Sequence, residues 1–361
     1  MRLVTKLTLA AGVGLSALAG TAGAAELRQI GTISIPGEPL NSFDISYIDQ
    51  GTGMLYLADR SNKGIDIIDT KKGAWVGRVA GMVGFSGKND TSGPNGVVIA
   101  GKEAWVGDGD STIKVIDLKS MKIVDTIKTG GKNRADEIGY DPKDGVIAIA
   151  NADDDPPFLT LISTKPGHKI IGKLEMPNFT DGMEQTVFNP ADGMFYTDIP
   201  EMDKDKTKGG LLVTNPKTAK QVKIIPVDSC VPHGLAFGPN GAAFLGCNAG
   251  NERLGLPAKQ VVVDTKAGKV VAEITGIGGS DESAVNNKLD QYYGALNGNP
   301  DGPILAVVDA KTNKLLQKIP TGPGAHSVAA NESNGRVYVP IAVEAGPLKG
   351  GCGCIAVYGT E

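Results

Sequence analysis

The sequence lacks most of the motifs by which enzymes and nucleic-acid-binding proteins are identified. Its 361 residues include three histidines, four cysteines and 5% aromatic residues, with a formal net charge of −4. No basic stripe is present, which argues against nucleic acid as a partner. The Gly-x-Gly-x-x-Gly and Walker patterns, the Gly-x-Ser-x-Gly elbow and the Cys-x-x-Cys-His motif are all absent. These absences give no support to nucleotide binding, serine hydrolase chemistry or covalent haem.

Long hydrophobic runs are also missing, except at the N-terminus. Two basic residues precede an apolar run from Leu7 to Leu18, and Ala22-Gly23-Ala24 matches the Ala-x-Ala pattern of a cleavage site. This combination is typical of a secretory signal peptide and is too short for a membrane-spanning helix. We therefore expect residues 1–25 to be a signal peptide cleaved near Ala24, and residues 26–361 to form a single domain. The mature protein is predicted to be a periplasmic or secreted monomer with no membrane span.

Glycine and proline, in contrast, are abundant, with 50 and 21 residues. They separate short β-branched runs that alternate apolar and polar residues, which is the pattern of half-buried antiparallel strands joined by hairpins. These runs recur along the chain: VIDLKSMKIV at 115–124 is echoed by IIDTKKGAWV at 67–76, VVDTKAGKVV at 262–271 and VVDAKTNKLL at 307–316. Recurrence at a period of about 45 residues indicates a propeller or a solenoid.

Seven such units follow one another along the chain. They begin near Asp44, Asn95, Asp136, Glu184, His233, Asp281 and His326. The seventh unit lacks its fourth strand, whereas the run from Leu27 to Pro36 is a fourth strand without a unit. Pairing the two closes a ring, while a linear solenoid needs polar capping repeats that are not visible. The sequence therefore predicts an all-β fold, a seven-bladed β-propeller closed by its N-terminal strand.

The units resemble the YVTN-type β-propeller repeat, in which a Y-V-A-N-like second strand precedes a V-x-V-I-D third strand. The matching pieces are MLYLADRSNKGIDIID, AWVGDGDSTIKVIDL and VYVPIAVE, with tails such as IVDTIKTG and LLQKIPTG. The resemblance covers Leu27 to Tyr358 and implies the fold, but such propellers serve as enzymes, binding modules and subunits of redox complexes. Units three, four and six depart from the repeat through the insertions ADDDPP, EMDKDKTK and GNPDG. Insertions in one class of loop lie on one face of the disc, often the binding face.

A polar residue stands at the same register in every unit, where the first strand begins at the mouth of the channel. Counting back from the glycine that ends each first strand gives Asp44, Asn95, Asp136, Glu184, His233, Asp281 or Glu282, and His326. Three hypotheses fit this ring: a solvated channel mouth, a bound metal ion, or a general acid–base site. For the metal hypothesis the expected ligands are His233, His326, Glu184, Asp136 and Asp44, and the cofactor is one divalent transition-metal ion or Ca²⁺.

The four cysteines are interpreted in the light of the predicted export. An even number in an oxidising compartment favours disulfides. Cys230 precedes the first strand of unit five and Cys247 ends its second strand, so antiparallel pairing predicts a Cys230–Cys247 disulfide. Cys352 and Cys354 flank a single glycine, and either a bridge between them or a pair of thiolate ligands for a thiophilic metal fits this spacing.

The sequence thus predicts an exported propeller that binds a ligand, a metal or a protein through its top face. Two alternatives stay open beside it. One is a metal-dependent lyase, hydrolase or oxidoreductase with its site at the channel mouth, and the other is a non-catalytic subunit of a periplasmic redox complex. A small-molecule ligand and a periplasmic protein partner are both compatible with the sequence, which identifies no substrate or reaction.

Overall fold

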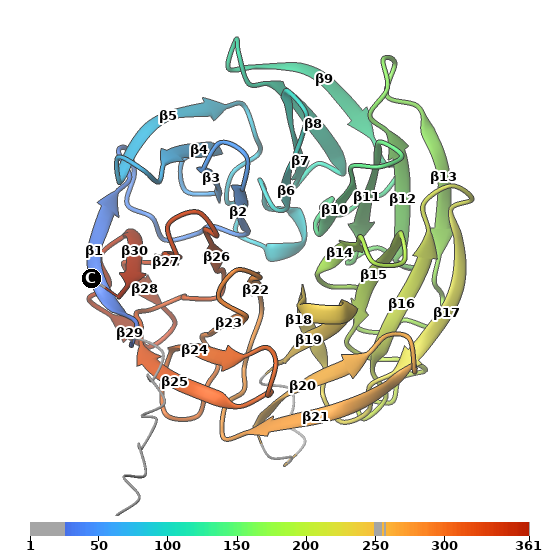
Figure 1. The fold of residues 1–361 in the computed structure, drawn as a ribbon. Helices are drawn as coiled ribbons and strands as arrows, with labels where there is room; N and C mark the ends of the chain where they lie inside the picture. Colours follow the sequence, from blue (N-terminus) through green and yellow to red (C-terminus); the bar gives the residue numbers. More distant parts are fainter. Residues whose placement is uncertain (1–25, 249–254, 256–257, 361) are drawn as a thin grey trace, which may run out of the picture.

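The computed structural model describes residues 26–248, 255 and 258–360. Within them, seven four-stranded antiparallel sheets stand around a central axis as the blades of a propeller (Figure 1). In blades one to six the strand order follows the chain, from the axis to the rim. The predicted seven-bladed, all-β fold is therefore confirmed. The predicted signal peptide lies outside the described residues, among which no helix has the length and apolar character of a membrane span.

Strands at the same position have similar lengths in successive blades. From blade one to blade six, the innermost strands are β2 (Ser46–Asp49), β6 (Val97–Ala100), β10 (Ile138–Asp141), β14 (Thr186–Asn189), β18 (Pro232–Phe237) and β22 (Ser283–Asn286). The second strands are β3 (Met54–Asp59), β7 (Glu103–Asp108), β11 (Val146–Asn151), β15 (Met194–Ile199), β19 (Ala242–Cys247) and β23 (Gln291–Leu296). The third strands are β4 (Gly64–Asp69), β8 (Thr112–Asp117), β12 (Phe158–Ser163), β16 (Gly210–Asn215), β20 (Lys259–Asp264) and β24 (Ile304–Asp309). The outermost strands are β5 (Ala74–Ala80), β9 (Lys122–Lys128), β13 (Ile170–Glu175), β17 (Lys220–Pro226), β21 (Lys269–Thr275) and β25 (Leu315–Pro320).

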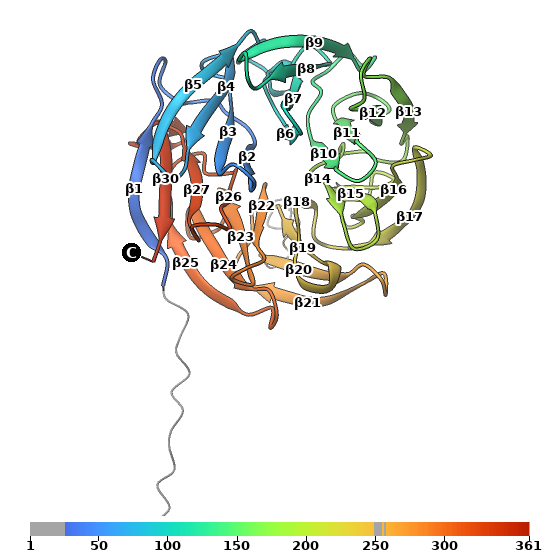
Figure 2. The ribbon, with the colours of Figure 1, turned by 45° about the horizontal axis from the view of Figure 1, so that its top comes forward.

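Blade seven is completed by the N-terminal strand. From the axis outward its strands are β26 (Ala329–Ala330), β27 (Val337–Ile341), β30 (Cys354–Gly359) and β1 (Arg28–Ser34). Figure 2 shows β1 and β30 side by side at the rim, where they pair antiparallel. The preceding residue, Leu27, also ties the closure to blade six, because its backbone N–H donates to Oε1 of Gln317 at 2.9 Å. The predicted ring closure is confirmed.

The hydrophobic core is divided among the interfaces between blades. Seven clusters of buried residues occur in the described part of the chain, and each joins two neighbouring blades. Leu55 and Leu57 of β3, for example, are fully buried against blade seven. Burying a leucine side chain of this kind contributes about 1.5–3 kcal/mol. Contacts between blades therefore hold the polar residues of the inner strands in fixed positions around the axis.

The outermost strands all carry a β-bulge at the same register. In β5, for example, Trp75 and Gly77 pair with successive residues of β4, and Val76 between them is left unpaired. The unpaired residue is apolar in every blade: Ile30, Val76, Val124, Ile171, Val222, Val271 and Leu316. A bulge twists the strand and interrupts its hydrogen-bonding edge. Interrupted rim strands are poor templates for pairing with another chain.

The loops between the second and third strands lie on the face that holds the channel mouth. They are long in blades three, four and six, as predicted, where they span residues 152–157, 200–209 and 297–303, and also in blade five, where the loop of residues 248–258 was not predicted. Blade seven has a further insertion there that was not predicted from the sequence, the hairpin of β28 (Glu344–Ala345) and β29 (Leu348–Lys349). Two short 3₁₀ turns complete the described structure, η1 (Asn89–Thr91) before β6 and η2 (Pro239–Gly241) before β19.

Candidate functional site

Most of the residues at the predicted register meet around one cavity, here named the mouth cavity. It has a volume of about 320 Å³ and lies where the innermost strands begin. Six of the seven units contribute ring residues to its wall: Asp44, Asp136, Glu184, His233, Asp281 with Glu282, and His326. Asn95 of the second unit does not line the cavity and instead accepts a hydrogen bond from Arg60. The repeat register thus gathers four carboxylate-bearing and two imidazole-bearing units at one end of the channel.

Two arginines, which the repeat register did not identify, also line the mouth cavity and form ion pairs with some of its acids. Arg60 follows β3 and forms an ion pair with Asp44. Arg134 lies in the loop before β10, with its guanidinium 2.7 Å from carboxylate oxygens of both Asp136 and Asp153. The two arginine side chains are only 7% and 10% exposed. The carboxylates of blades one and three are therefore already paired with cations of the protein itself.

The histidine of blade seven belongs to this paired half. The ring of His326 stacks on Phe43 at 4.7 Å, and its Nε2 lies 3.7 Å from Asp44. Burial alone would raise the pKa of Asp44, but Arg60, His326 and Arg134 together lower it to about 2. Burial alone would lower the pKa of His326, but its hydrogen bond to Asp44 and the charge of Asp281 raise it. These shifts favour an imidazolium–carboxylate pair, in which the ring of His326 has no lone pair to offer a metal and the carboxylate of Asp44 is held by cations.

The other half of the wall is different, because three potential ligands lie close together there and none of the described residues that line it is an arginine. One ligand atom each from Glu184, His233 and Asp281 can be chosen so that all three lie within 4.8 Å of one another. Nε2 of His233 is 3.3 Å from Oε1 of Glu184. Burial, with the charge of Asp281, raises the pKa of Glu184 well above its usual range. Blades four, five and six thus place two carboxyl groups and one imidazole around one point.

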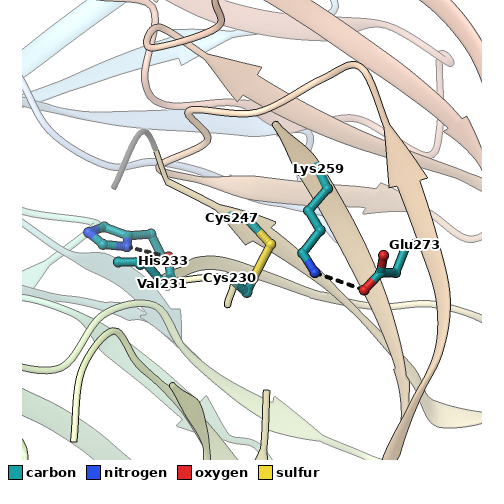
Figure 3. Close-up of a disulfide and its surroundings, with 6 residues drawn as sticks. All are labelled: Cys230, Val231, His233, Cys247, Lys259 and Glu273. Carbon is teal, nitrogen blue, oxygen red and sulfur yellow. Dashed lines mark hydrogen bonds and ion pairs between the residues drawn. A yellow bond between two sulfur atoms is a disulfide. The ribbon is translucent and has the colours of Figure 1, made fainter. Parts of the chain in front are cut away.

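The orientation of His233 is set by the backbone of its own segment. Its Nδ1 is 3.0 Å from the carbonyl oxygen of Val231, to which it donates (Figure 3). A neutral ring that donates from Nδ1 carries its lone pair on Nε2, the atom that faces Glu184. The same segment is anchored by the Cys230–Cys247 disulfide, which joins it to the end of β19 (Figure 3). In its neutral form, His233 therefore directs the lone pair of Nε2 into the mouth cavity.

Both cysteine pairs are bridged. The S–S distances are 2.05 Å for Cys230–Cys247 and 1.99 Å for Cys352–Cys354, and no cysteine is free. The first disulfide is the one predicted from antiparallel pairing in unit five. Cys352 and Cys354 were expected either to form a disulfide or to bind a thiophilic metal as thiolates. They form the disulfide, and a disulfide offers no thiolate to a metal.

Two further acids close the base of the mouth cavity. Glu137 and Glu282 come from opposite blades, three and six, and are 6% and 5% exposed. Their side chains interact with each other, and each shifts the pKa of the other. Burial, with the charges of neighbouring carboxylates, raises the pKa of both well above the usual range. The repeat register had left Glu282 as an alternative to Asp281, and both residues are part of the channel wall.

Comparison with known proteins places the chain by its fold. No family model matches the sequence. No curated protein matches it either. Among solved structures, a chain of the hydrazine synthase from Kuenenia stuttgartiensis superposes with a TM-score of 0.69 at 15% identity, over 90% of this chain and 96% of that chain. Likeness at this identity shows the fold alone, and the chain is a β-propeller with an acidic channel mouth.

Proposed function

We propose that the protein is an exported YVTN-type propeller whose mouth cavity binds a divalent transition-metal ion through Glu184, His233 and Asp281. The observation that carries the proposal is the convergence of these three ligand atoms within 4.8 Å of one another. Three protein ligands with a position left for water or substrate are typical of an accessible metal site. The two disulfides support export, because such bonds persist in oxidising compartments.

The donor set favours a transition metal over Ca²⁺. One imidazole and two carboxylates suit Zn²⁺, Mn²⁺ or Fe²⁺, whereas Ca²⁺ takes six to eight oxygen ligands. The hydrogen bond from His233 Nδ1 to Val231 is the kind of outer contact that orients a ligating imidazole. Asp44, Asp136 and His326, which were also expected as ligands, are engaged with Arg60, Arg134 and one another. We therefore propose a smaller ligand set than the sequence suggested, with Asp281 added.

The charge of the mouth cavity supports a cation as the ligand. Among the described residues, six carboxyl groups line it, from Asp44, Asp136, Glu137, Glu184, Asp281 and Glu282, against the guanidinium groups of Arg60 and Arg134. A cleft lined by an excess of one sign concentrates counter-ions of the other sign. A bound divalent ion would offset the repulsion among the acids of blades four to six. Its open positions would be the binding point for a small molecule or a partner's side chain.

The two channel histidines provide a matched experiment. Both occupy the same register and both donate from Nδ1 to a carbonyl oxygen two residues earlier. The full mature chain is stripped with chelator and titrated with Co²⁺, whose visible absorption changes when protein ligands replace its water. We expect one equivalent to bind to the parent protein and to His326→Ala, and His233→Ala to bind at least tenfold more weakly. The proposal fails if the parent binds no stoichiometric cobalt, or if the two variants are weakened equally.

A further inference from the structure

A second and larger cavity occupies the rest of the central channel. It has a volume of about 980 Å³ and is lined by the innermost strands of blades one to six. Its outer end is formed by the turns that follow those strands, such as Gly51 and Pro190, whereas the mouth cavity lies where the strands begin. The two cavities therefore open towards opposite faces of the disc. We name the larger one the lower cavity.

The wall of the lower cavity is mainly apolar and aromatic. Tyr47, Tyr140, Val187, Phe188 and Val285 line the cavity, and all five are only half-buried although they lie in the innermost strands. Half-exposed aromatic residues at the centre of a disc leave a wet apolar surface. Covering such a surface with an apolar ligand is favourable.

The inner end of the lower cavity is acidic. Glu137 and Glu282, which close the base of the mouth cavity, also line the lower cavity. The residues described around the lower cavity include no lysine, arginine or histidine. The neighbouring side chain of Gln185 carries no charge that could offset the two acids. Its Oε1 accepts hydrogen bonds from the backbone N–H groups of Leu235 and Ser283. An apolar tunnel that ends at two carboxyl groups is complementary to one kind of small molecule.

We propose that the lower cavity binds an organic ammonium ion, with its charged group at Glu137 and Glu282 and its apolar body against the channel wall. An ammonium group has three N–H donors, which two carboxyl groups can accept at once. The faces of tyrosine and phenylalanine rings add attraction for a cation. The volume is within the range of small-molecule sites, which leaves room for a body larger than a simple alkyl chain. This site is distinct from the proposed metal site and does not need a metal.

Ligands of different charge distinguish specific binding of an ammonium group from non-specific binding of any apolar chain in the lower cavity. Hexylammonium, hexanol and hexanoate have the same chain and differ in the head group. Titration calorimetry on chelator-treated full mature protein at pH 7 is expected to show one hexylammonium per chain, with hexanol at least tenfold weaker and no binding of hexanoate. Equal affinity for the three molecules, or no binding of hexylammonium, would overturn the proposal. Neither result would bear on the proposed metal site, because no metal is present in this experiment.

Near-isosteric variants then locate the ammonium group. Glu137→Gln and Glu282→Gln keep the size of the side chain and replace a carboxyl oxygen, which accepts hydrogen bonds, with an amide N–H₂ group, which donates them. Each is therefore expected to weaken hexylammonium binding at least tenfold. Glu273→Gln is the matched control, because Glu273 lies on the rim strand β21 and pairs with Lys259. The control should bind as the parent does. Undiminished binding in both channel variants would place the ligand elsewhere and refute the assignment.

Discussion

Replacing Arg60 with methionine is expected to destabilise the protein by removing the partner of a buried carboxylate. Arg60 and Asp44 form an ion pair whose side chains are 7% and 14% exposed. Breaking a buried pair by removing one partner costs about 3–5 kcal/mol, because the remaining charge is left uncompensated. A second guanidinium, that of Arg134, stays 3.8 Å from Asp44. We therefore expect a loss near the lower end of that range, about 3 kcal/mol.

The acid dependence of stability provides a second magnitude, for Asp44 with all of its partners. Asp44 has a pKa of about 2 in the folded protein, against an ordinary value of 3.8. The difference corresponds to about 2.5 kcal/mol of stability, which is present above pH 4 and is lost as the pH falls towards 2. In Arg60→Met the pKa of Asp44 rises, so the part of the acid-induced loss that Asp44 contributes should shrink.

Urea-induced unfolding measures both effects in the chain from residue 26 onwards. The free energy of unfolding of the parent and of Arg60→Met is determined at pH 7 and at several values between pH 2 and 5. Arg28→Met is the control, because Arg28 is exposed on the rim strand β1, and it should change stability by less than about 0.5 kcal/mol. Adding Asp44→Asn to Arg60→Met removes the orphaned charge and should recover part of the loss. The reasoning is refuted if Arg60→Met costs no more than Arg28→Met, or if the double variant is less stable than Arg60→Met.

Two further predictions concern the disulfides and one buried acid. Removing the disulfide of Cys230 and Cys247 by double alanine substitution should lower the free energy of unfolding in urea by about 3 kcal/mol, because this bridge spans 17 residues. The disulfide of Cys352 and Cys354 closes almost no loop, so its removal should cost far less. Equal costs for the two removals would contradict this reasoning. Burial raises the pKa of Asp66 to about 7, so the folded state binds its proton more tightly than the unfolded chain and stability falls as the pH rises from 4 to 7. Asp66→Asn should flatten this slope, by up to about 1 kcal/mol per pH unit, and an unchanged slope would exclude Asp66 as its source.

The fold was predictable because the repeat period, the missing strand and the spare strand all point to one closed ring. The run from Leu27 to Pro36 matched the outermost strands, and its pairing with β30 is what the structure contains. The hairpin of β28 and β29 was missed because its residues, GPLKGG among them, are rich in glycine and carry no alternation of apolar and polar residues. Local patterns predict regular strands well, but they say little about short pairs inside loops.

The candidate site was predictable only as a ring of positions. Counting back from the glycine turns brought Glu184 and His233 to the same cavity, because equivalent residues of a propeller occupy equivalent radii. Which acids are neutralised depends on Arg60 and Arg134, which lie outside the register and reach the mouth cavity from the ends of β3 and of the loop before β10. Contacts of this kind join segments far apart in the chain, and no repeat pattern encodes them.

The lower cavity could not be predicted from the ring positions at all. It depends on which innermost-strand residues face the axis and on how far apart the seven blades hold them. Glu137 directly follows the ring residue Asp136, so the alignment of units selected Asp136 and passed over Glu137. Its contact with Glu282 across the channel exists only once the ring is closed.

Crystals of the protein soaked in Co²⁺ test the central claim most directly. The anomalous signal at the cobalt edge locates the ion without reference to any assumed activity. We predict one strong peak in the mouth cavity, about 2.0–2.1 Å from Nε2 of His233 and bonded to carboxylate oxygens of Glu184 and Asp281. An empty mouth cavity at saturating cobalt, or a peak beside Asp44 and His326 instead, would contradict the account.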